Sequence, residues 1–296
     1  MEKHCKLLQA ADSIWQKEDG SHEAFASAKI NIGLYVVERR PDGYHNLETV
    51  FYPISLHDNL HVGPLHEADG PYRLQLAGNA IEGNPEDNLI IKAYRQLAAD
   101  YPLPPIDIYL YKRVPTGAGL GGGSSDAAYM MKVLNQRFEL GMDNEEMKQR
   151  VARLGADCAF FIDNHPAFAT GIGDVLTPCA VSLKGMTLLL VKPDTFVSTK
   201  EAYGGVTPQR PRYDLREAIA APVETWKDTI SNDFEISVFQ HHQEIAAIKQ
   251  TLYDMGAVYA SMSGSGSTVF GLFRHPVEEA QRVFADCFVY QSQLEY

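Results

Sequence analysis

The amino-acid sequence predicts an α+β fold in two domains. The chain has 296 residues and 45% apolar content, which is enough for a large core and about two domains. Its first strand-like segments follow one another without helices between them, whereas later segments mix strand and helix patterns. A doubly wound sheet would alternate strands and helices from the start, so this order favours α+β.

The first third of the chain predicts mostly strands. Alternating apolar residues over 25–38 predict a strand, and the PDGYH that follows at 41–45 has the chemistry of a turn. LETVFYPIS, NLHVG and YRLQLAG predict three further strands. Residues 86–101 have the apolar spacing of a helix, and residues 104–114 predict a strand that runs into a glycine-rich loop.

Beyond that loop, helical and strand patterns are mixed. TLLLVKP predicts a buried strand, and residues 257–273 predict two strands joined by a second glycine-rich loop. We expect helices over 124–138, 144–154, 214–221, 241–255 and 277–287.

The expected domains are residues 24–165 and 166–296, because the loops near 164–166 and 179–185 are the candidate boundary. Residues 1–23 are expected to form an appendage of unknown role. Its apolar residues predict one short amphipathic helix, and they are Leu7, Leu8, Ala11 and Ile14.

Composition excludes several classes of function. A net charge of −12 and a pI of about 5.3 argue against a nucleic-acid-binding surface, although one anionic ligand can still bind at a local site. Four cysteines without a C-x-x-C pair argue against a disulfide framework or a zinc ribbon, and favour a reducing cytoplasm. The sequence has no apolar run of about 18 residues and no signal-peptide core, so we expect no membrane span.

The most informative segment is PTGAGLGGGSSDAA, which covers 115–128. Glycines permit positive φ and let a ligand approach the backbone closely. Consecutive N–H groups then form a concavity suited to phosphate, and the helix expected behind it adds its positive N-terminal end. The sequence therefore predicts a strand, a phosphate-binding loop and a helix.

Several kinds of loop remain open from these residues. The loop contains no lysine, so it is not a P-loop of the G-x-x-x-x-G-K-[ST] type. Residues 117–122 match the dinucleotide fingerprint G-x-G-x-x-G, but they follow some 115 residues of β-rich chain instead of opening a doubly wound sheet. An NAD(P)-dependent oxidoreductase, a different nucleoside-triphosphate loop and a tight turn without a ligand are the alternatives.

Three ordered segments resemble the motifs of the GHMP kinases, the family named for galactokinase and the homoserine, mevalonate and phosphomevalonate kinases. They are ASAKINIGLYVVERRPDGYHNLETVF, PTGAGLGGGSSDAA and SMSGSGSTVFGLF. The resemblance runs from about Ala24 to the C-terminal helix and implies the family's two-domain fold, with the active site in the cleft between the domains. EDNLIIKA, GADCAFF and SNDFE, together with AKIN and RPDGYH, resemble the members that act on a cytidine diphosphate in the non-mevalonate isoprenoid route.

This resemblance implies transfer of the γ-phosphoryl group of ATP, with Mg²⁺, to the 2-hydroxyl of a methylerythritol group. Asp157 matches the aspartate that serves as general base. Lys29 would lower the pKa of the acceptor hydroxyl and stabilise charge on the transferring group. Asn31 lies two residues on, so it faces the same side of the strand and is expected at the acceptor end. An edge-strand lysine that faces water is the alternative for Lys29.

The resemblance also assigns binding residues. Tyr44 and His45 would bind the cytidine, with Tyr203 as a second aromatic plate and Thr199 nearby. Gly264 and Gly266 would bring a second backbone segment toward the substrate. The expected ATP-binding residues are Asn88, Lys112, Pro115, Thr116, Gly117, Ala118, Gly119, Leu120, Gly121, Gly122, Gly123, Ser124 and Ser125.

Other residues receive modest roles. We expect Asp126 to cap the following helix, with Mg²⁺ binding as its alternative. Cys158 and Ala159 stand where the family has Val-Pro, and we expect Cys158 to be a small buried residue instead of a nucleophile. His241 and His242 are expected on the surface. For Asn232 and Asp233 we expect no specific catalytic or binding role, and a structural hydrogen-bonding role is the alternative. A kinase for another small alcohol and a catalytically silent nucleotide-binding protein remain alternatives, and the chain is expected to be a monomer or a homodimer.

Overall fold

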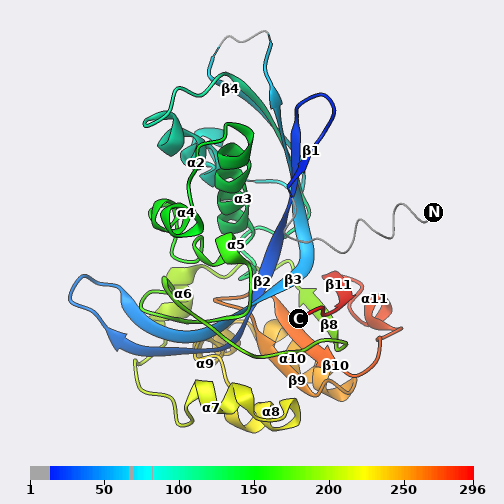
Figure 1. The fold of residues 1–296 in the computed structure, drawn as a ribbon. Helices are drawn as coiled ribbons and strands as arrows, with labels where there is room; N and C mark the ends of the chain where they lie inside the picture. The colour runs from blue at the N-terminus through cyan, green and yellow to red at the C-terminus, as the bar shows by residue number, and fades with distance from the viewer. Residues whose placement is uncertain (1–13, 67–69, 82) are drawn as a thin grey trace. The chain divides into compact units, whose positions relative to one another are not determined.

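The computed structural model describes residues 14–66, 70–81 and 83–296 (Figure 1). The described chain divides into two compact units that are each discontinuous in sequence. The first contains the described residues up to Ala28 together with those of Ile54–Thr116 and Gly121–Asn164, and the second contains Lys29–Pro53, Gly117–Leu120 and His165–Tyr296. The expected boundary between two contiguous domains, at residues 165–166, stays a prediction. Leu7, Leu8 and Ala11 of the expected N-terminal helix lie outside the described residues.

The first unit contains a sheet in the strand order β1-β2-β3-β5-β4. β1 (Trp15–Gln16) pairs with the start of β2 (His22–Arg39), so residues 15–16 and 22–23 of the expected appendage belong to this sheet. The end of β3 (His45–Pro64) is antiparallel to β5 (Ile106–Lys112). β4 (Tyr72–Gly78) is parallel to β5, and a helix in the connection makes this parallel pairing possible.

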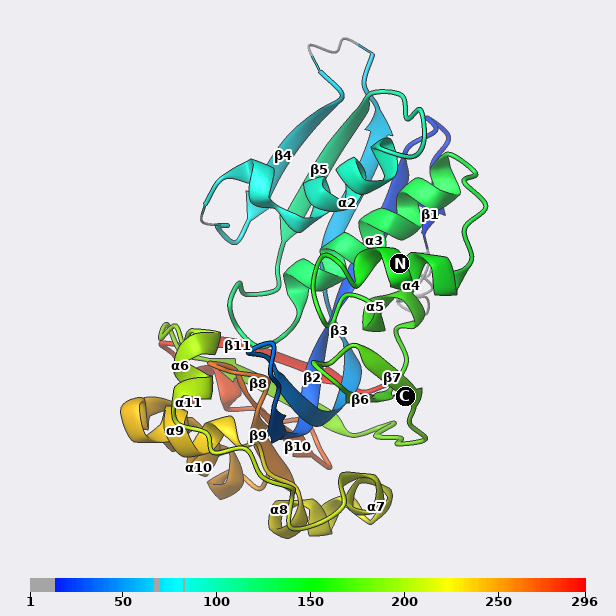
Figure 2. The ribbon, with the colours of Figure 1, turned by 90° about the vertical axis from the view of Figure 1, so that its left-hand side faces the viewer.

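Helices cover one face of β4 and β5 (Figure 2). Along β5, Ile106, Ile108 and Leu110 are buried while Tyr109 and Tyr111 are exposed, as expected for a strand with one covered face. The chain enters α2 (Leu89–Ala98) through a 3₁₀ turn at Pro85–Asp87. The other helices of this unit are α3 (Gly122–Arg137), α4 (Asn144–Val151) and α5 (Phe160–Asp163).

The second unit contains the hairpin formed by the end of β2 and the start of β3. β6 (Ala167–Thr170) is antiparallel to β3 at Thr49–Phe51, and β7 (Val175–Pro178) pairs with β6. β2 and β3 therefore each contribute residues to both compact units.

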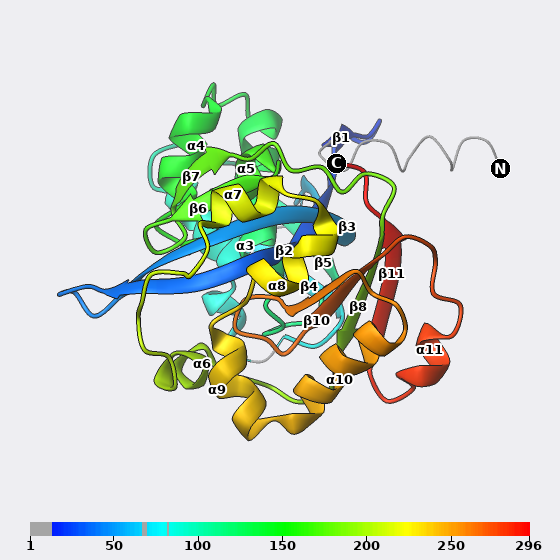
Figure 3. The ribbon, with the colours of Figure 1, turned by 90° about the horizontal axis from the view of Figure 1, so that it is seen from below.

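The second unit also contains a four-stranded antiparallel sheet in the order β11-β8-β10-β9. Its strands are β8 (Thr187–Lys192), β9 (Tyr259–Met262), β10 (Val269–Phe273) and β11 (Phe288–Gln293). α10 (Gln243–Asp254) packs against β9 and β10, and α9 (Phe234–His241) packs against α6 (Thr199–Gly204) (Figure 3). Leu34 and Val36 of β2 join this core, so the hairpin is part of it.

The remaining helices are short: α7 (Leu215–Ala220), the 3₁₀ turn Val223–Thr225, α8 (Trp226–Thr229) and α11 (Ala280–Val283). No helix in residues 14–66, 70–81 and 83–296 is long and apolar enough to cross a lipid bilayer. Helices and strands are mixed in both units, which confirms the predicted α+β class.

Three sequence predictions about elements are wrong. LETVFYPIS and NLHVG form one strand, β3, because the polar Asp58 between them is buried and paired instead of exposed in a turn. The helix expected over 277–287 is only the four residues of α11, and the chain then forms β11, which pairs along β8. The helix expected over 241–255 begins at Gln243, because His242 leaves the helical conformation with φ −128°.

Candidate active site

The glycine-rich loop lies between β5 and α3, as the sequence predicts. Gly117, Gly119 and Gly121 have φ values of 60°, 75° and 72°, which favour glycine. Gly121 is the N-cap of α3, and no side chain of the described residues caps that end. The first N–H groups of this 16-residue helix therefore remain for an anionic ligand.

Within the second unit, the backbone at Gly119 lies close against the backbone at Ser263. A Cβ atom at this position would lie 1.9 Å from the carbonyl oxygen of Ser263, so only glycine fits. The Gly119 carbonyl accepts hydrogen bonds from Ser263 Oγ and from Lys29 Nζ, both at 2.9 Å. The second glycine-rich segment and β2 thus meet at the centre of the loop.

Lys29 is a buried and paired lysine, with 4% of its surface exposed. Its Nζ donates to Asn31 Oδ1 at 2.6 Å as well as to Gly119, and it lies 5.3 Å from the centroid of the Phe51 ring. The alternative of an edge-strand lysine that faces water is therefore wrong. Asn31 Nδ2 donates in turn to Thr49 Oγ1 at 3.0 Å, which fixes the orientation of the Asn31 amide.

The segment around Ser263 is held by Asn232, for which a structural hydrogen-bonding role was the alternative expected from the sequence. Asn232 Nδ2 donates to the carbonyls of Met262 and Gly264, at 2.8 and 2.9 Å. Asp233 Oδ2 accepts from the N–H of Val36 at 2.8 Å. The SNDFE segment therefore supports the second glycine-rich loop through hydrogen bonds to its backbone.

Asp157 lies in a turn of the first unit, close in sequence to α5. The turn places Gly155 against Ser124 of the phosphate loop, since a Cβ atom on Gly155 would lie 3.5 Å from Ser124 Oγ. Asp157 is half-buried and does not serve as the N-cap of α5, which is Ala159. Capping of α5 therefore does not explain Asp157.

Cys158 is fully buried next to this turn. Burial, together with the nearby Asp157 charge, raises the pKa of the Cys158 thiol to about 12. The thiol is therefore protonated near neutral pH, and the prediction of a buried structural cysteine is confirmed.

We expect native protein at pH 8 to leave Cys158 unmodified by iodoacetamide, while the half-buried Cys179 reacts. Peptide mapping by mass spectrometry before and after denaturation measures both sites. Modification of Cys158 at the rate of Cys179 in folded protein would contradict this expectation.

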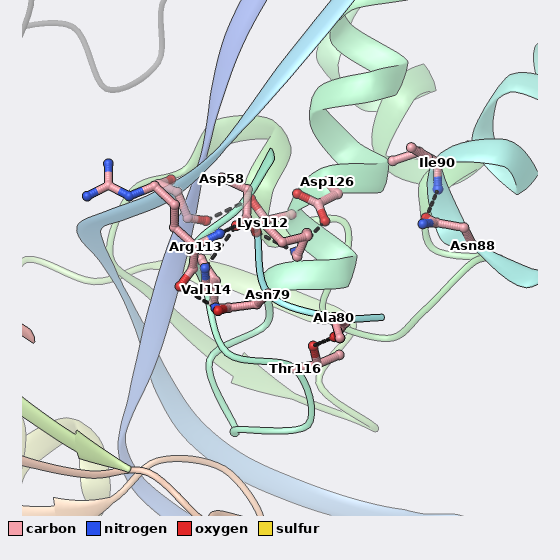
Figure 4. A network of polar contacts seen from close by, with 12 residues as sticks. Asp58, Asn79, Ala80, Asn88, Ile90, Lys112, Arg113, Val114, Thr116 and Asp126 are labelled. Atoms are coloured by element: carbon pink, nitrogen blue, oxygen red, sulfur yellow. Dashed lines mark hydrogen bonds and ion pairs between the residues drawn. The ribbon is translucent and has the colours of Figure 1, made fainter. Parts of the chain in front are cut away.

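A buried ion cluster lies at the base of the phosphate loop (Figure 4). Lys112 Nζ forms ion pairs with Asp58 Oδ2 and, at 2.6 Å, with Asp126 Oδ2. Asp58 Oδ1 accepts from the N–H groups of Arg113 and Val114, at 2.5 and 2.9 Å. We call Asp58, Lys112 and Asp126 the loop-base triad.

The triad corrects one expectation from the sequence. Asp126 is the fifth residue of α3, and its carboxylate binds Lys112 instead of capping the helix. Lys112, which is expected near ATP, has its ammonium group buried between two carboxylates. Asp58 was missed, and the only signal for it was a charged residue inside a strand-like stretch of apolar alternation.

Protonation of the triad has a consequence for stability. Burial raises the pKa of Asp126 to about 7; Lys112 opposes this rise and Asp58 adds to it. In the unfolded chain the carboxyl loses its proton near pH 4, so the folded protein loses stability as pH rises from about 4 to 7. The side chain of Asp126→Asn cannot ionise, so this variant escapes that loss. We expect its Tm, relative to the Tm of the parent, to increase as pH rises from about 4 to 7. A constant difference in Tm between pH 4.5 and 7.5 would contradict the raised pKa.

The aromatic residues expected at the cytidine lie in the second unit. Tyr44 is 61% exposed on the turn between β2 and β3. The His45 and Tyr203 rings are stacked, with centroids 4.8 Å apart, and Tyr203 also packs edge-on against Phe234. Thr199 is the first residue of α6, which also carries Tyr203. One face of Tyr203 is therefore covered by His45 in this structure.

The other expected ATP residues take part in local hydrogen bonds of the first unit. Asn88 caps α2 by accepting from the N–H of Ile90, and Thr116 Oγ1 donates to the Ala80 carbonyl at 3.2 Å (Figure 4). Ser125 is buried and donates to the Ser27 carbonyl, whereas Ser124 is half-buried. Ser124 is therefore the more accessible of the two hydroxyls.

His241 and His242 have ordinary partners. His241 Nδ1 lies 2.9 Å from the Ser237 carbonyl, and His242 Nε2 lies 2.7 Å from Glu201. Across the part of the chain that the structure describes, no group of three or more His, Cys, Asp or Glu residues is arranged to hold a metal ion.

Comparison with known proteins gives consistent matches. The model of the GHMP kinase N-terminal domain matches residues 88–171, and that of the C-terminal domain matches residues 216–289. A protein of Bacteroides thetaiotaomicron named 4-diphosphocytidyl-2-C-methyl-D-erythritol kinase is 55% identical over 249 residues, which cover 84% of this chain and 91% of that protein. A protein of Porphyromonas gingivalis with the same name is 44% identical over 270 residues, covering 90% of this chain and 98% of that protein.

Solved structures of kinases also match this chain. The crystal structure of a 4-(cytidine 5'-diphospho)-2C-methyl-D-erythritol kinase matches with a TM-score of 0.77 and 31% identity, covering 91% of this chain and 98% of that one. A homoserine kinase from Cytophaga hutchinsonii matches with a TM-score of 0.62 and 15% identity, covering 95% of this chain and 96% of that one, which shows a shared fold alone.

Proposed function

This chain belongs to the GHMP kinase family, and we propose that it phosphorylates 4-diphosphocytidyl-2-C-methyl-D-erythritol with ATP. The phosphoryl group goes to the 2-hydroxyl, and the products are the 2-phosphate and ADP. The reaction is a step of the non-mevalonate isoprenoid pathway. The observation that carries the proposal is the 44–55% identity to proteins named for this activity over most of both chains.

The phosphate loop is proposed to bind the phosphates of ATP. Positive-φ glycines and the uncapped N-terminus of α3 supply N–H donors and a positive dipole end, which are what a polyphosphate requires. Mg²⁺ bound to the phosphates would neutralise charge that develops during transfer. Mg²⁺ prefers oxygen ligands and usually takes only one or two from the protein beside phosphates and water, and the half-buried Ser124 offers a hydroxyl oxygen in the first turn of α3. Ser124 is the residue proposed to hold it.

Asp157 is proposed as the general base and Lys29 as the cation that activates the acceptor hydroxyl. Phosphoryl transfer depends mainly on positioning and charge stabilisation, and both are served by a lysine whose rotamer is fixed. The contacts of Lys29 with Asn31 and Gly119 support this role, because they tie its ammonium group to the phosphate loop. Asn31 is proposed to position Lys29 and to face the acceptor end.

The cytidine is proposed to bind at Tyr44, His45 and Tyr203, with Thr199 nearby. Because His45 stacks on Tyr203, a cytosine ring placed on that face of Tyr203 requires the His45 side chain to rotate away. The displaced imidazole would then be able to hydrogen-bond the edge of the base. Gly264 and Gly266, with φ values of 57° and 88°, are proposed to approach the substrate with their backbone.

Neither alternative from the sequence is favoured. A dinucleotide oxidoreductase is a different family, and the homologues of high identity are named for the cytidine substrate instead of for another small alcohol. We further propose a cytoplasmic enzyme, because its cysteines have the spacing of a reduced protein. A monomer and a homodimer both remain open.

The test is ADP release with Mg²⁺-ATP and 4-diphosphocytidyl-2-C-methyl-D-erythritol, with mevalonate and homoserine in parallel. We expect turnover with the cytidine compound only. Turnover with another acceptor would keep the ATP assignment and overturn the Tyr44–His45 assignment. Silence with all three in folded protein, together with NADPH binding by nicotinamide fluorescence, would overturn the kinase proposal.

A further inference from the structure

The loop-base triad is buried where the proposed phosphate loop begins and ends. Lys112 is the last residue of β5, before the loop, and Asp126 follows the loop within α3. Their ion pair at 2.6 Å therefore closes residues 113–125 into a ring. Asp58 comes from a third element, β3, and binds both Lys112 and the first two N–H groups of the loop.

The start of α3 packs directly on this ring closure. A Cβ atom on Gly122, the first residue of α3, would lie 3.0 Å from Val114 Cγ1 and 3.4 Å from Lys112 Nζ. The ammonium group is therefore a few ångströms from the helix end whose N–H groups are proposed to face the phosphates. A shift of Lys112 would move the entry to the loop and the start of the helix together.

We propose that Asp58, Lys112 and Asp126 are positioning residues, which set the geometry and local charge of the phosphate loop for ATP without contacting the nucleotide. This inference rests on the proposed function for the identity of the ligand. It reassigns Lys112 from direct ATP binding. All three side chains are at most 3% exposed, so Lys112 is already satisfied by protein groups and is screened from a ligand by its partners.

The charge of the triad depends on one proton. With both carboxylates ionised the triad carries −1, and with one proton it is neutral. Asp126 Oδ1 is buried and has no hydrogen-bond partner among the described residues, so no donor stabilises the ionised form of the carboxyl at this oxygen. Burial raises the pKa of Asp126 to about 7. Two charged groups also act on this carboxyl: Lys112, from β5, lowers its pKa, and Asp58, from β3, raises it. Burial alone would lower the pKa of Lys112, but Asp126 and Asp58 raise it, so Lys112 stays charged.

The first experiment is a double-mutant cycle on the dissociation constant of Mg²⁺-ATP, with Lys112→Met, Asp126→Leu and the double variant. If the residues act through their ion pair, each single variant weakens ATP binding by about ten- to hundred-fold, and the double variant is no weaker than Lys112→Met alone. If Lys112 contacts ATP itself, the two fold-changes multiply, and that outcome overturns the proposal.

Lys148→Met is the matched control. Lys148 also pairs with two carboxylates of the first unit, Glu145 at 2.7 Å and Asp163 at 2.5 Å, but on the surface. We expect the ATP dissociation constant of this variant to stay within about twofold of the parent, because exposed pairs contribute little. Should Lys112→Met fail to fold, the isosteric Asp126→Asn, which keeps a hydrogen-bond acceptor for Lys112, provides the second readout.

That readout is the pH profile of KM for ATP against KM for the cytidine substrate. Above pH 7 the parent triad gains a negative charge near the phosphates, so we expect KM for ATP to rise roughly three- to tenfold between pH 6 and 8.5. Asp126→Asn should flatten this rise relative to the parent and leave KM for the cytidine substrate unchanged. Parallel profiles in parent and variant would overturn the proposal.

Failure of this inference is distinguishable from failure of the proposed function. Direct Mg²⁺-ATP titration needs no second substrate, so the cycle reports on the triad even if the cytidine compound is not phosphorylated. Loss of ATP binding in the parent protein would overturn both.

Discussion

Replacing Asp157 by Asn is expected to slow phosphoryl transfer by about 10²- to 10⁴-fold, the range that a positioned general base contributes. The amide has nearly the same shape as the carboxylate but cannot accept the proton of the acceptor hydroxyl. ATP and the cytidine substrate should still bind with dissociation constants within about threefold of the parent. Single-turnover rates and direct titration of both substrates measure the two effects separately.

Asp163→Asn is the matched control for this variant. Asp163 lies in α5, a few residues after Asp157, and pairs on the surface with Lys148. The control loses the same charge from the same part of the chain, and we expect its turnover to stay within about twofold of the parent. Normal turnover of Asp157→Asn would refute the base assignment.

Replacing Gly119 by Ala is expected to have the largest effect on folded-state stability. The new methyl group would overlap the Ser263 carbonyl oxygen at 1.9 Å, and the residue would also have to hold φ +75°. A left-handed backbone costs about 1–2 kcal/mol for alanine and overpacking typically costs about 1–3 kcal/mol, so we expect a loss of about 2–5 kcal/mol in the free energy of unfolding. Because the Gly119 carbonyl also binds Lys29, turnover should fall as well.

Gly123→Ala is the control for stability. Gly123 is in the first turn of α3, and its Cβ would meet only Leu89 Cδ1 at the ordinary distance of 3.8 Å. Alanine is a better helix former than glycine by about 1 kcal/mol, so this variant should be at least as stable as the parent. Chemical denaturation of the three proteins compares them, and equal destabilisation of both variants would mean that the contact with Ser263 does not matter.

The parts of the fold that the sequence predicts best are those governed by local pattern. The strand β4 matches its predicted residues, and α3 begins at Gly122, two residues before the predicted start at residue 124. Both follow from alternation and from glycine chemistry, which act over a few residues. β11 was missed because its strand state depends on pairing with β8, about a hundred residues earlier in the chain. Tertiary pairing of this kind overrides local helical preference.

In the candidate site, too, local features were predictable from the sequence and contacts with distant residues were not. The burial and pairing of Lys29 were predicted because a lysine within a strand of small and apolar residues requires a partner. Which partners it has was not predictable, since Asn31 is local but Gly119 is ninety residues away. Asp58 was missed for a similar reason, because a single polar residue acquires its role only when distant backbone reaches it. The hydrogen-bonding role expected for Asn232 is confirmed, but its partners, some thirty residues away, were not predictable.

The discontinuous second unit has a consequence for the order in which the chain is made. Leu34 and Val36 complete a core whose other members include Val269 and Phe284. A ribosome that adds about 5–20 residues per second therefore delivers these partners roughly 12–50 s after the hairpin has emerged. During this interval the hairpin exposes apolar residues and strand edges, so nascent chains shorter than about 270 residues are the ones that need a chaperone. Pulse proteolysis of stalled nascent chains should find residues 29–53 cleavable until the last strands have left the exit tunnel.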